Sequence, residues 1–222
     1  MQTPRYIFAD DFSGFEEYFR TVPHKRRSFK RGESLWAPGQ PFSPIYYILS
    51  GLTLTCIHHE GGHRKILSFH GQGTVFPVYH NNEFKIEKSI VTQALGDVEV
   101  MEFSRQQFHD MLKKNFSLSE TVINWYAAYV NLLLYETAHQ EYNSAFIKLC
   151  NLLYLLAEKD KKAGGKISLT QEELADILAA NRVNLSRNLA RLRQEGIIAT
   201  SRKQIDVIRP DLLAAYCSNE TL

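Results

Sequence analysis

The residues with the clearest chemical character lie near the carboxyl end of the chain, where basic side chains gather. Between residues 182 and 209 only Glu195 and Asp206 are acidic. The basic residues of this stretch are Arg182, Arg187, Arg191, Arg193, Arg202, Lys203 and Arg209. A local basic patch on a chain of net charge +2 is typical of a surface that binds phosphates. Charge alone leaves one alternative open, a solvated helix face.

Catalytic chemistry has no comparable support. Ser, His and Asp are present, but no nucleophile elbow or phosphate-binding glycine loop surrounds them, and Ser50-Gly51 is a turn. Cys56, Cys150 and Cys217 are too few and too scattered for a disulfide framework or for a four-cysteine zinc or iron–sulfur site. We therefore expect a binding protein rather than an enzyme.

The basic patch must be positioned by two helices that the sequence delimits well. Thr170 and Glu173 form a capping box, which predicts a helix from Gln171 to about Ala179. Asn181 caps a second helix, Arg182–Gln194, which stops at Gly196. The short turn between them fits a helix-turn-helix, and the strands predicted at 197–200 and 204–208 form a wing.

The second helix of this motif is expected to contact double-stranded DNA. Arginine pairs best with guanine and asparagine with adenine in the major groove, and further arginines suit phosphates. The expected contacts are Arg182, Asn184, Ser186, Arg187, Arg191, Arg202 and Lys203. Ala179 departs from the usual turn glycine, and Asn188 from the usual inward apolar residue. The remaining alternative is a pair of amphipathic helices packed in a purely structural α domain.

Short β-formers separated by glycines precede this region, over residues 28–103. The predicted strands are Ile45–Leu49, Leu52–Ile57, Lys65–Phe69, Ser89–Gln93 and Val98–Phe103. Regular short strands with turn signals predict an all-β barrel or sandwich. Glu60-Gly-Gly-His63 predicts a hairpin turn, because glycine adopts positive φ at no steric cost.

A single long helix is predicted for residues 117–142, which contain neither Gly nor Pro. One apolar stripe is Leu118, Val122, Trp125, Tyr129 and Leu132, and a second is Ile123, Tyr126, Val130 and Leu134. Two apolar faces need two packing partners. We expect the first stripe to pair two copies of the chain through Val122, Trp125, Tyr129 and Leu132. The alternative is a helix buried between two domains of one chain.

The order of these parts resembles the Crp/Fnr family of transcription regulators. Lys30-Arg-Gly-Glu33, Gly39 and Tyr46-Tyr-Ile-Leu-Ser-Gly51 are similar to its β-roll, and residues 169–178 and 182–187 are similar to its DNA-binding motif. The resemblance covers roughly 15–215 and implies an α+β chain. Its parts are a β-roll effector domain (1–116), a dimerisation helix (117–143) and a winged helix-turn-helix (144–222). The implied partners are a palindromic DNA site, a second copy of the chain and RNA polymerase.

The resemblance also bears on the effector. In cAMP-binding members a Gly-Glu pair engages the ribose and an Arg-Ser pair the phosphate. Here Phe76-Pro77 and Lys88-Ser89 take those places, so cAMP is not expected. The expected effector contacts are Phe76, Tyr79, Lys88, Ser89, Tyr126 and Tyr129. Some members sense halogenated aromatic acids, which the aromatic surroundings permit. The residue after Arg182 is acidic in relatives close to the cAMP-binding activator, but here it is Val183. An acidic side chain can accept a hydrogen bond from cytosine N4 and valine cannot, so the resemblance implies a different half-site sequence.

Two other functions remain open. A cupin-like metal enzyme would need converging histidines, but His58, His59 and His63 flank a predicted turn, and neither haem nor metal is expected. A regulator without effector could respond to redox state through Cys56 or Cys150. No membrane span or secretory signal is visible, so we expect a cytoplasmic protein without membrane contact.

Overall fold

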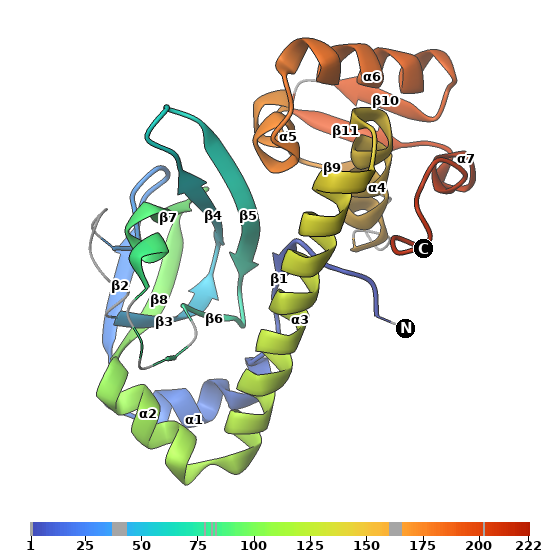
Figure 1. Ribbon diagram of the computed structural model, residues 1–222. Helices are drawn as coiled ribbons and strands as arrows, with labels where there is room; N and C mark the ends of the chain where they lie inside the picture. Colours follow the sequence, from blue (N-terminus) through green and yellow to red (C-terminus); the bar gives the residue numbers. More distant parts are fainter. Residues whose placement is uncertain are drawn as a thin grey trace. The chain divides into compact units, whose positions relative to one another are not determined.

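The computed structural model describes residues 2–36, 44–77, 79, 80, 82, 84–159, 166–201 and 203–222, so Gly39 and Arg202 lie outside the described part. The chain forms two compact units (Figure 1). One is Ile7–Ala128, and the other joins Met1–Tyr6 to Tyr129–Leu222. The expected boundaries, at both ends of the long helix, differ from this division, which falls within the helix.

The unit Ile7–Ala128 contains two four-stranded sheets, as a β-roll of eight strands requires. The first sheet has the order β1 (Ile7–Phe8), β5 (Arg64–Gly71), β4 (Leu52–His58), β7 (Ile90–Ala94). The second has the order β2 (Lys25–Phe29), β8 (Val98–Ser104), β3 (Pro44–Ser50), β6 (Val75–Phe76). The strand predicted to start at Ser89 starts at Ile90, because Ser89 still belongs to the 3-10 helix η2 (Lys85–Ser89).

The core of this unit consists largely of aromatic and branched side chains on the strands. Tyr46, Tyr47 and Phe103 are at most 2% exposed, and Phe19 packs on Tyr47 and Phe103 with ring centroids 5.0 and 5.9 Å away. Gly51 is required between β3 and β4, since its φ is +90° and a Cβ would lie 2.4 Å from the Asp97 carbonyl oxygen. The hairpin predicted at residues 60–63 is present and joins β4 to β5.

Short helices complete the unit. They are η1 (Ser13–Phe15), α1 (Glu16–Thr21), η2 and α2 (Arg105–Lys114). Ser104 begins α2 with a capping box, in which its hydroxyl accepts from the Gln107 backbone N–H while the Gln107 side chain accepts from the Ser104 N–H.

Helix α3 (Phe116–Tyr142) confirms the predicted long helix to within one residue, but the stripe expected at a dimer interface is largely buried within the chain. Val122, Trp125 and Leu132, expected at a dimer interface, are only 6%, 3% and 0% exposed because they pack within the chain. Trp125, for example, lies 5.1 Å from the Phe8 ring. Tyr129, the fourth residue of that set, is half-buried.

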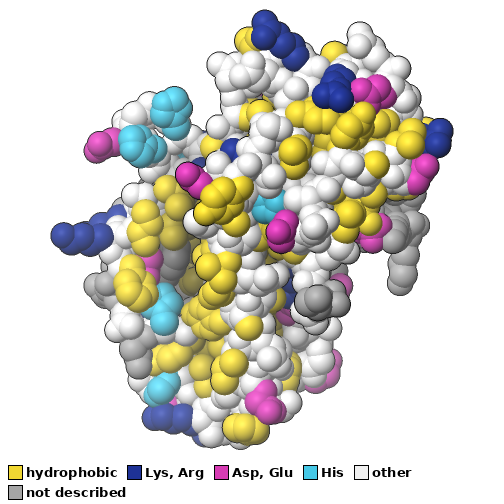
Figure 2. Space-filling view, turned by 45° about the vertical axis from the view of Figure 1, so that its right-hand side comes forward, with side chains coloured by type: hydrophobic (Ala, Val, Ile, Leu, Met, Phe, Trp, Pro, Cys, Tyr) yellow, Lys and Arg dark blue, Asp and Glu magenta, His cyan; other side chains and the backbone are white. Residues whose placement is uncertain are grey.

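The second stripe of α3 is the one that the chain leaves uncovered. Ile123, Val130 and Leu134 are 66%, 49% and 65% exposed, and they lie on one side of the helix. Figure 2 shows hydrophobic side chains (yellow) along the middle of the molecule. We call Ile123, Val130 and Leu134 the exposed stripe.

The second unit carries the predicted helix-turn-helix and wing. Its helices after α3 are α4 (Ala145–Lys159), α5 (Gln171–Leu178), α6 (Arg182–Gln194) and α7 (Pro210–Ala214). Its sheet has the order β10 (Ile198–Ser201), β11 (Gln204–Val207), β9 (Lys166–Ile167). Strand β9 and helix α7 were not predicted. Leu149, Leu153 and Leu174 are fully buried, which gives the unit a core of its own.

Buried hydrogen bonds tie the end of α3 to α4 and to the last residues of the chain. The Tyr135 and Thr221 hydroxyls are 2.8 Å apart. The Asn151 amide lies 3.0 Å from His139 Nδ1 and donates to the Ser218 hydroxyl over 3.0 Å, while the Ser218 N–H donates back to Asn151 over 3.0 Å. Thr221, Asn151 and His139 are at most 5% exposed, so these bonds form inside the protein. We call this set the polar junction.

Candidate nucleic-acid interface

Helix α5 is fixed at both ends by its own sequence. At its start the Thr170 hydroxyl accepts from the Glu173 N–H (3.1 Å), and the Glu173 carboxylate accepts from the Thr170 N–H (2.7 Å), as the capping box predicts. At its end Ala179 adopts the left-handed conformation, with φ 47° and ψ 41°. The turn to α6 therefore has the geometry for which glycine is common, although the residue is alanine.

Helix α6 separates a buried face from an exposed one. Asn181 caps it by accepting from the Val183 N–H over 2.8 Å. Leu185, Leu189 and Leu192 are at most 2% exposed and hold the helix on the unit. On the exposed face stand the predicted DNA contacts Asn184, Ser186 and Arg187, and with them Val183, which is 57% exposed.

Arg182 is also exposed, but it has a partner. Its guanidinium forms an ion pair with the Glu172 carboxylate on α5, and the two side chains are 71% and 58% exposed. Pairs in such contact with water contribute little to stability. A phosphate or a guanine edge can therefore replace Glu172 as the partner of Arg182 at a small cost in free energy.

Two arginines further along α6 have structural contacts. Arg191 was expected at a phosphate, but its guanidinium carbon lies 4.0 Å from the centre of the Phe146 ring and 5.3 Å from that of Tyr216. It also donates to the Glu195 carboxylate over 2.9 Å. Arg191 thus joins α6 to α4 and to the segment after α7, and its contact with a phosphate stays a prediction. Arg193 donates to the Thr200 hydroxyl over 3.2 Å and thereby links α6 to the wing.

The wing presents one described basic residue. β10 and β11 pair from Ile198↔Val207 to Ser201↔Gln204, which leaves Arg202 and Lys203 in the turn. Lys203 is exposed and has φ 59°, while Arg202 lies outside the described residues. A hollow of about 140 Å³ separates the wing from the start of α5, with Thr170, Gln171, Ser201 and Lys203 among its lining residues.

These parts form a surface suited to duplex DNA. A capped helix presents Asn184, Ser186 and Arg187 on one open face, and a strand turn places Lys203 in the same unit. Figure 2 shows Lys and Arg side chains (dark blue) projecting from this unit. An exposed helix of this kind fits the major groove, and a wing reaches neighbouring phosphates.

The expected effector residues are only partly brought together. The Tyr126 hydroxyl donates to the Tyr79 carbonyl over 3.2 Å, so α3 and the segment after β6 meet here. Phe76 is 6% exposed and stacks on His70 at 3.8 Å. Tyr129 belongs to the other unit.

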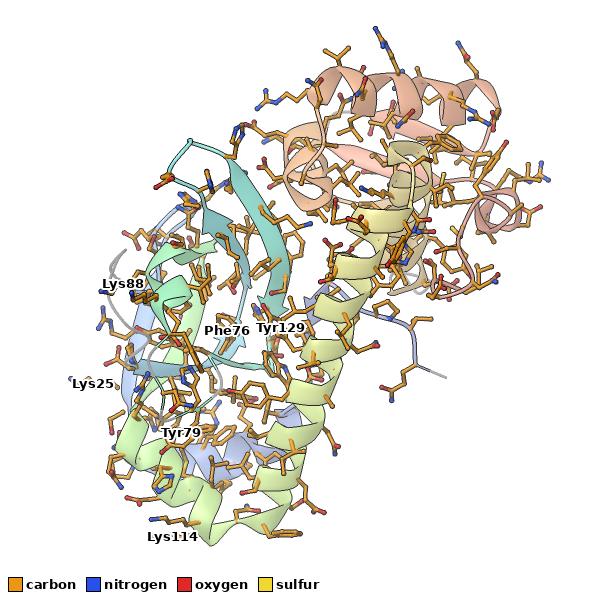
Figure 3. The ribbon with its side chains drawn as sticks, in the orientation of Figure 1. Lys25, Phe76, Tyr79, Lys88, Lys114 and Tyr129 are labelled. Carbon is orange, nitrogen blue, oxygen red and sulfur yellow. The ribbon has the colours of Figure 1, made fainter. Side chains whose placement is uncertain are left out.

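Lys88 and Ser89, the residues expected to meet an anionic part of the effector, differ in exposure. Lys88 is exposed and lies at the outer edge of its unit (Figure 3), and Ser89 is half-buried. The buried neighbour is Glu87, at 4% exposure. The inward residue of this segment is thus an acid. The sequence predicted neither the burial of Glu87 nor its contact with His80, whose Nε2 lies 3.3 Å from Glu87 Oε1.

The histidine and cysteine alternatives receive no support from the described residues. Within them, no group of three or more His, Cys, Asp or Glu residues is placed to hold a metal ion. His58, His59 and His63 are exposed, as expected for a turn. Cys56 and Cys150 are fully buried, and burial raises the pKa of the Cys150 thiol to about 12, which makes it a poor redox sensor.

Comparison with known proteins gives consistent matches to both domains. Residues 26–115 match the family model "Cyclic nucleotide-binding domain", and residues 147–216 match the "Crp-like helix-turn-helix domain". Among curated relatives, the global nitrogen regulator of Nostoc sp. is 23% identical, over 84% of this chain and 86% of its own length. The cAMP-activated global transcriptional regulator CRP of Escherichia coli is 26% identical, over 76% and 82%.

Solved structures share the fold. FixK2 from Bradyrhizobium japonicum has a TM-score of 0.75 at 18% identity and covers 89% of this chain and 98% of its own. CprK complexed with OCPA also has a TM-score of 0.75, at 19% identity, over 97% and 99% of the two chains.

A β-roll, a long helix and a winged helix-turn-helix, in this order, define a DNA-binding transcription regulator with an effector-binding domain. The chain therefore carries both domains of the Crp/Fnr-type regulators that it is similar to. None of the helices in the part of the chain that the structure describes has the length and apolar character of a membrane span.

Proposed function

We propose that the protein acts as a homodimer that binds a palindromic DNA site, with Arg182, Asn184, Ser186 and Arg187 in the major groove and the wing at phosphates. The observation that carries the proposal is the open face of α6, on which these side chains stand beside the exposed Val183. Two such helices on a two-fold axis meet half-sites about 34 Å apart. Lys203, and Arg202 by sequence, are the proposed phosphate contacts of the wing.

The exposed stripe of α3 supports the dimer. Ile123, Val130 and Leu134 follow each other at spacings of seven and four residues, which is the repeat of a parallel helix pair. Exposed apolar side chains at this spacing are otherwise unfavourable in water. The stripe therefore replaces the residues first expected at the interface.

We further propose that a small molecule other than cAMP controls DNA binding from the β-roll. Phe76-Pro77 and the exposed Lys88 provide neither the carboxylate nor the guanidinium that the cyclic nucleotide would need. Effector binding would shift a population of DNA-binding conformations. Because its target is genomic DNA, we propose a cytoplasmic protein, and RNA polymerase as its partner at the promoter.

The test measures binding of fluorescein-labelled duplexes by anisotropy, using palindromic fragments from the protein's own promoter region and scrambled controls. Replacing Arg182 and Arg187 together by glutamine should weaken the selective complex by at least about a hundredfold, at about 1–3 kcal/mol for each lost base contact. Affinity should also fall steeply as salt rises.

A matched control removes two positive charges elsewhere. Lys25 and Arg26 are exposed on β2, so the Lys25→Gln, Arg26→Gln variant has the same net charge as the test variant. It should bind DNA like the unchanged protein. Equal loss in both variants, or no loss in the first, would contradict the proposed interface.

A further inference from the structure

We propose that Glu87, with His80 and Tyr126, forms the effector site of the β-roll, and that the site takes a small organic cation carrying paired N–H donors. The proposal rests on the proposed function, because it assigns the ligand class of the same domain. All three residues lie in the unit Ile7–Ala128.

The first observation is the position of the Glu87 carboxylate. The residue lies in η2, is 4% exposed, and within the described residues neither of its carboxylate oxygens accepts a hydrogen bond. A carboxylate has about four acceptor positions, and leaving them empty inside a protein costs free energy. A buried acid with this unused capacity is therefore suited to a ligand that brings donors.

The second observation is the neighbouring imidazole. His80 Nε2 lies 3.3 Å from Glu87 Oε1, which is ion-pair distance without hydrogen-bond geometry. His80 Nδ1 is also buried and, among the described residues, has no hydrogen-bond partner. Two adjacent side chains thus offer three polar atoms to a ligand.

One aromatic ring packs against the histidine of this pair. The Phe84 ring lies 5.6 Å from the His80 ring and is 53% exposed. Tyr126 is half-buried, and burial together with the charge of Glu87 raises the pKa of its hydroxyl to about 12. Aromatic faces next to a carboxylate favour cations, by cation–π attraction and by ion pairing.

The charges exclude the opposite class of ligand. Lys88, the residue expected to meet an anion, is exposed, whereas the acid beside it is buried. An anion placed against Glu87 would be repelled in a medium of low dielectric constant. A planar amidinium, by contrast, can donate two parallel N–H bonds to one carboxylate.

The experiment compares two ligands of equal shape and opposite charge on the full chain. Benzamidine and benzoate are titrated by isothermal calorimetry into the unchanged protein, Glu87→Gln and Glu99→Gln. Glu99 is an exposed acid on β8, so its variant controls for net charge. The pair acetamidine and acetate repeats the comparison with smaller probes.

Benzamidine or acetamidine should bind the unchanged protein and Glu99→Gln at least about tenfold more tightly than its anion, and Glu87→Gln should lose that preference. The proposal is overturned if neither cation binds, if cation and anion bind equally, or if Glu87→Gln keeps the preference of the unchanged protein for the cation.

Thermal unfolding gives a second, ligand-free test. An acid kept for ligand binding destabilises the free protein, so Glu87→Gln should unfold at the same or a higher temperature than the unchanged chain. A fall of more than about 4 °C would identify a structural ion pair with His80 and overturn the proposal. DNA anisotropy on the same samples separates the two hypotheses. If the unchanged protein binds DNA selectively but binds no cation, only the proposed effector site is refuted. If the unchanged protein does not bind DNA selectively, the proposed regulator function is refuted.

Discussion

His70 is an ionisable residue placed in an apolar core. Its ring stacks on Phe76 and lies 5.7 Å from Phe8 and 6.0 Å from Trp125. Burial lowers the pKa of this imidazole from 6.5 to about 3. It is therefore neutral in the folded protein at any pH at which a cell lives.

This gives the first prediction, a loss of stability in mild acid. The unfolded chain, with a histidine pKa of about 6.5, takes up a proton more readily than the folded one, so the contribution of neutral His70 is complete above pH 6.5 and declines as the pH falls toward 3. Between pH 7 and pH 5 the free energy of unfolding should fall by about 2 kcal/mol.

Urea denaturation at both pH values measures the effect in the unchanged protein, in His70→Phe and in His63→Gln. His70→Phe keeps a ring against Phe76 and should lose most of the pH dependence, whereas the exposed His63 should not matter. The assignment to His70 is refuted if all three proteins show the same pH dependence.

Single residues also show where sequence reasoning succeeds and fails. Arg187 and Asn184 were predicted on the open face of α6 and lie there, because capping and leucine spacing fix the helix register. Lys88 was predicted to contact the effector, but the structure exposes Lys88 and buries Glu87. In a 3-10 helix each residue turns the chain by about 120°, so an error of one position exchanges the buried and exposed sides.

At the scale of elements, the turn between α5 and α6 contains local strain. Ala179 has φ 47°, a conformation that costs an alanine about 1 kcal/mol relative to glycine. Ala179→Gly should therefore raise the free energy of unfolding by about 0.5 kcal/mol, because the entropy that glycine adds to the unfolded chain offsets roughly 0.5 kcal/mol of the relieved strain. Chemical denaturation measures the change.

The adjacent alanine is the control for this second prediction. Ala180 is not among the residues with positive φ, so Ala180→Gly should leave stability unchanged or reduce it. Equal effects of the two substitutions would show that the Ala179 backbone is not strained.

Elements with strong local signals were predictable, and those that depend on tertiary contacts were not. The Thr170 capping box defined α5, the Asn181 cap defined α6, and the absence of Gly and Pro defined α3. Strand β9 has two residues and exists because it pairs with β11. The ring contacts of Arg191 could not be predicted, because Phe146 and Tyr216 are 45 and 25 residues away in sequence.

At the scale of the whole molecule, the exposed stripe makes dimerisation testable. Ile123 and Leu134 are 66% and 65% exposed, so replacing both by glutamate should not disturb the core. Four like charges at a paired helix interface should convert the dimer to a monomer. Sedimentation equilibrium gives the mass, and affinity for the palindrome should fall by about a hundredfold or more while single half-site binding persists.

Lys114→Glu, an exposed substitution on α2, should leave the assembly unchanged. A dimeric double variant would place the interface elsewhere, and a monomeric unchanged protein would refute the dimer. The sequence indicated two apolar faces on α3 but not which was internal, because burial depends on residues such as Phe8 that lie far away in the chain.

The polar junction has a mechanical consequence. Apolar side chains can slide past one another with gradual changes in energy, but hydrogen bonds are directional and fail once their geometry is lost. The set that joins Tyr135, His139 and Asn151 to Ser218 and Thr221 is therefore either made or broken. A displacement of this end of α3 should therefore leave the hydrogen bonds to α4 and to the last residues intact up to a threshold and then break them, rather than weaken them gradually.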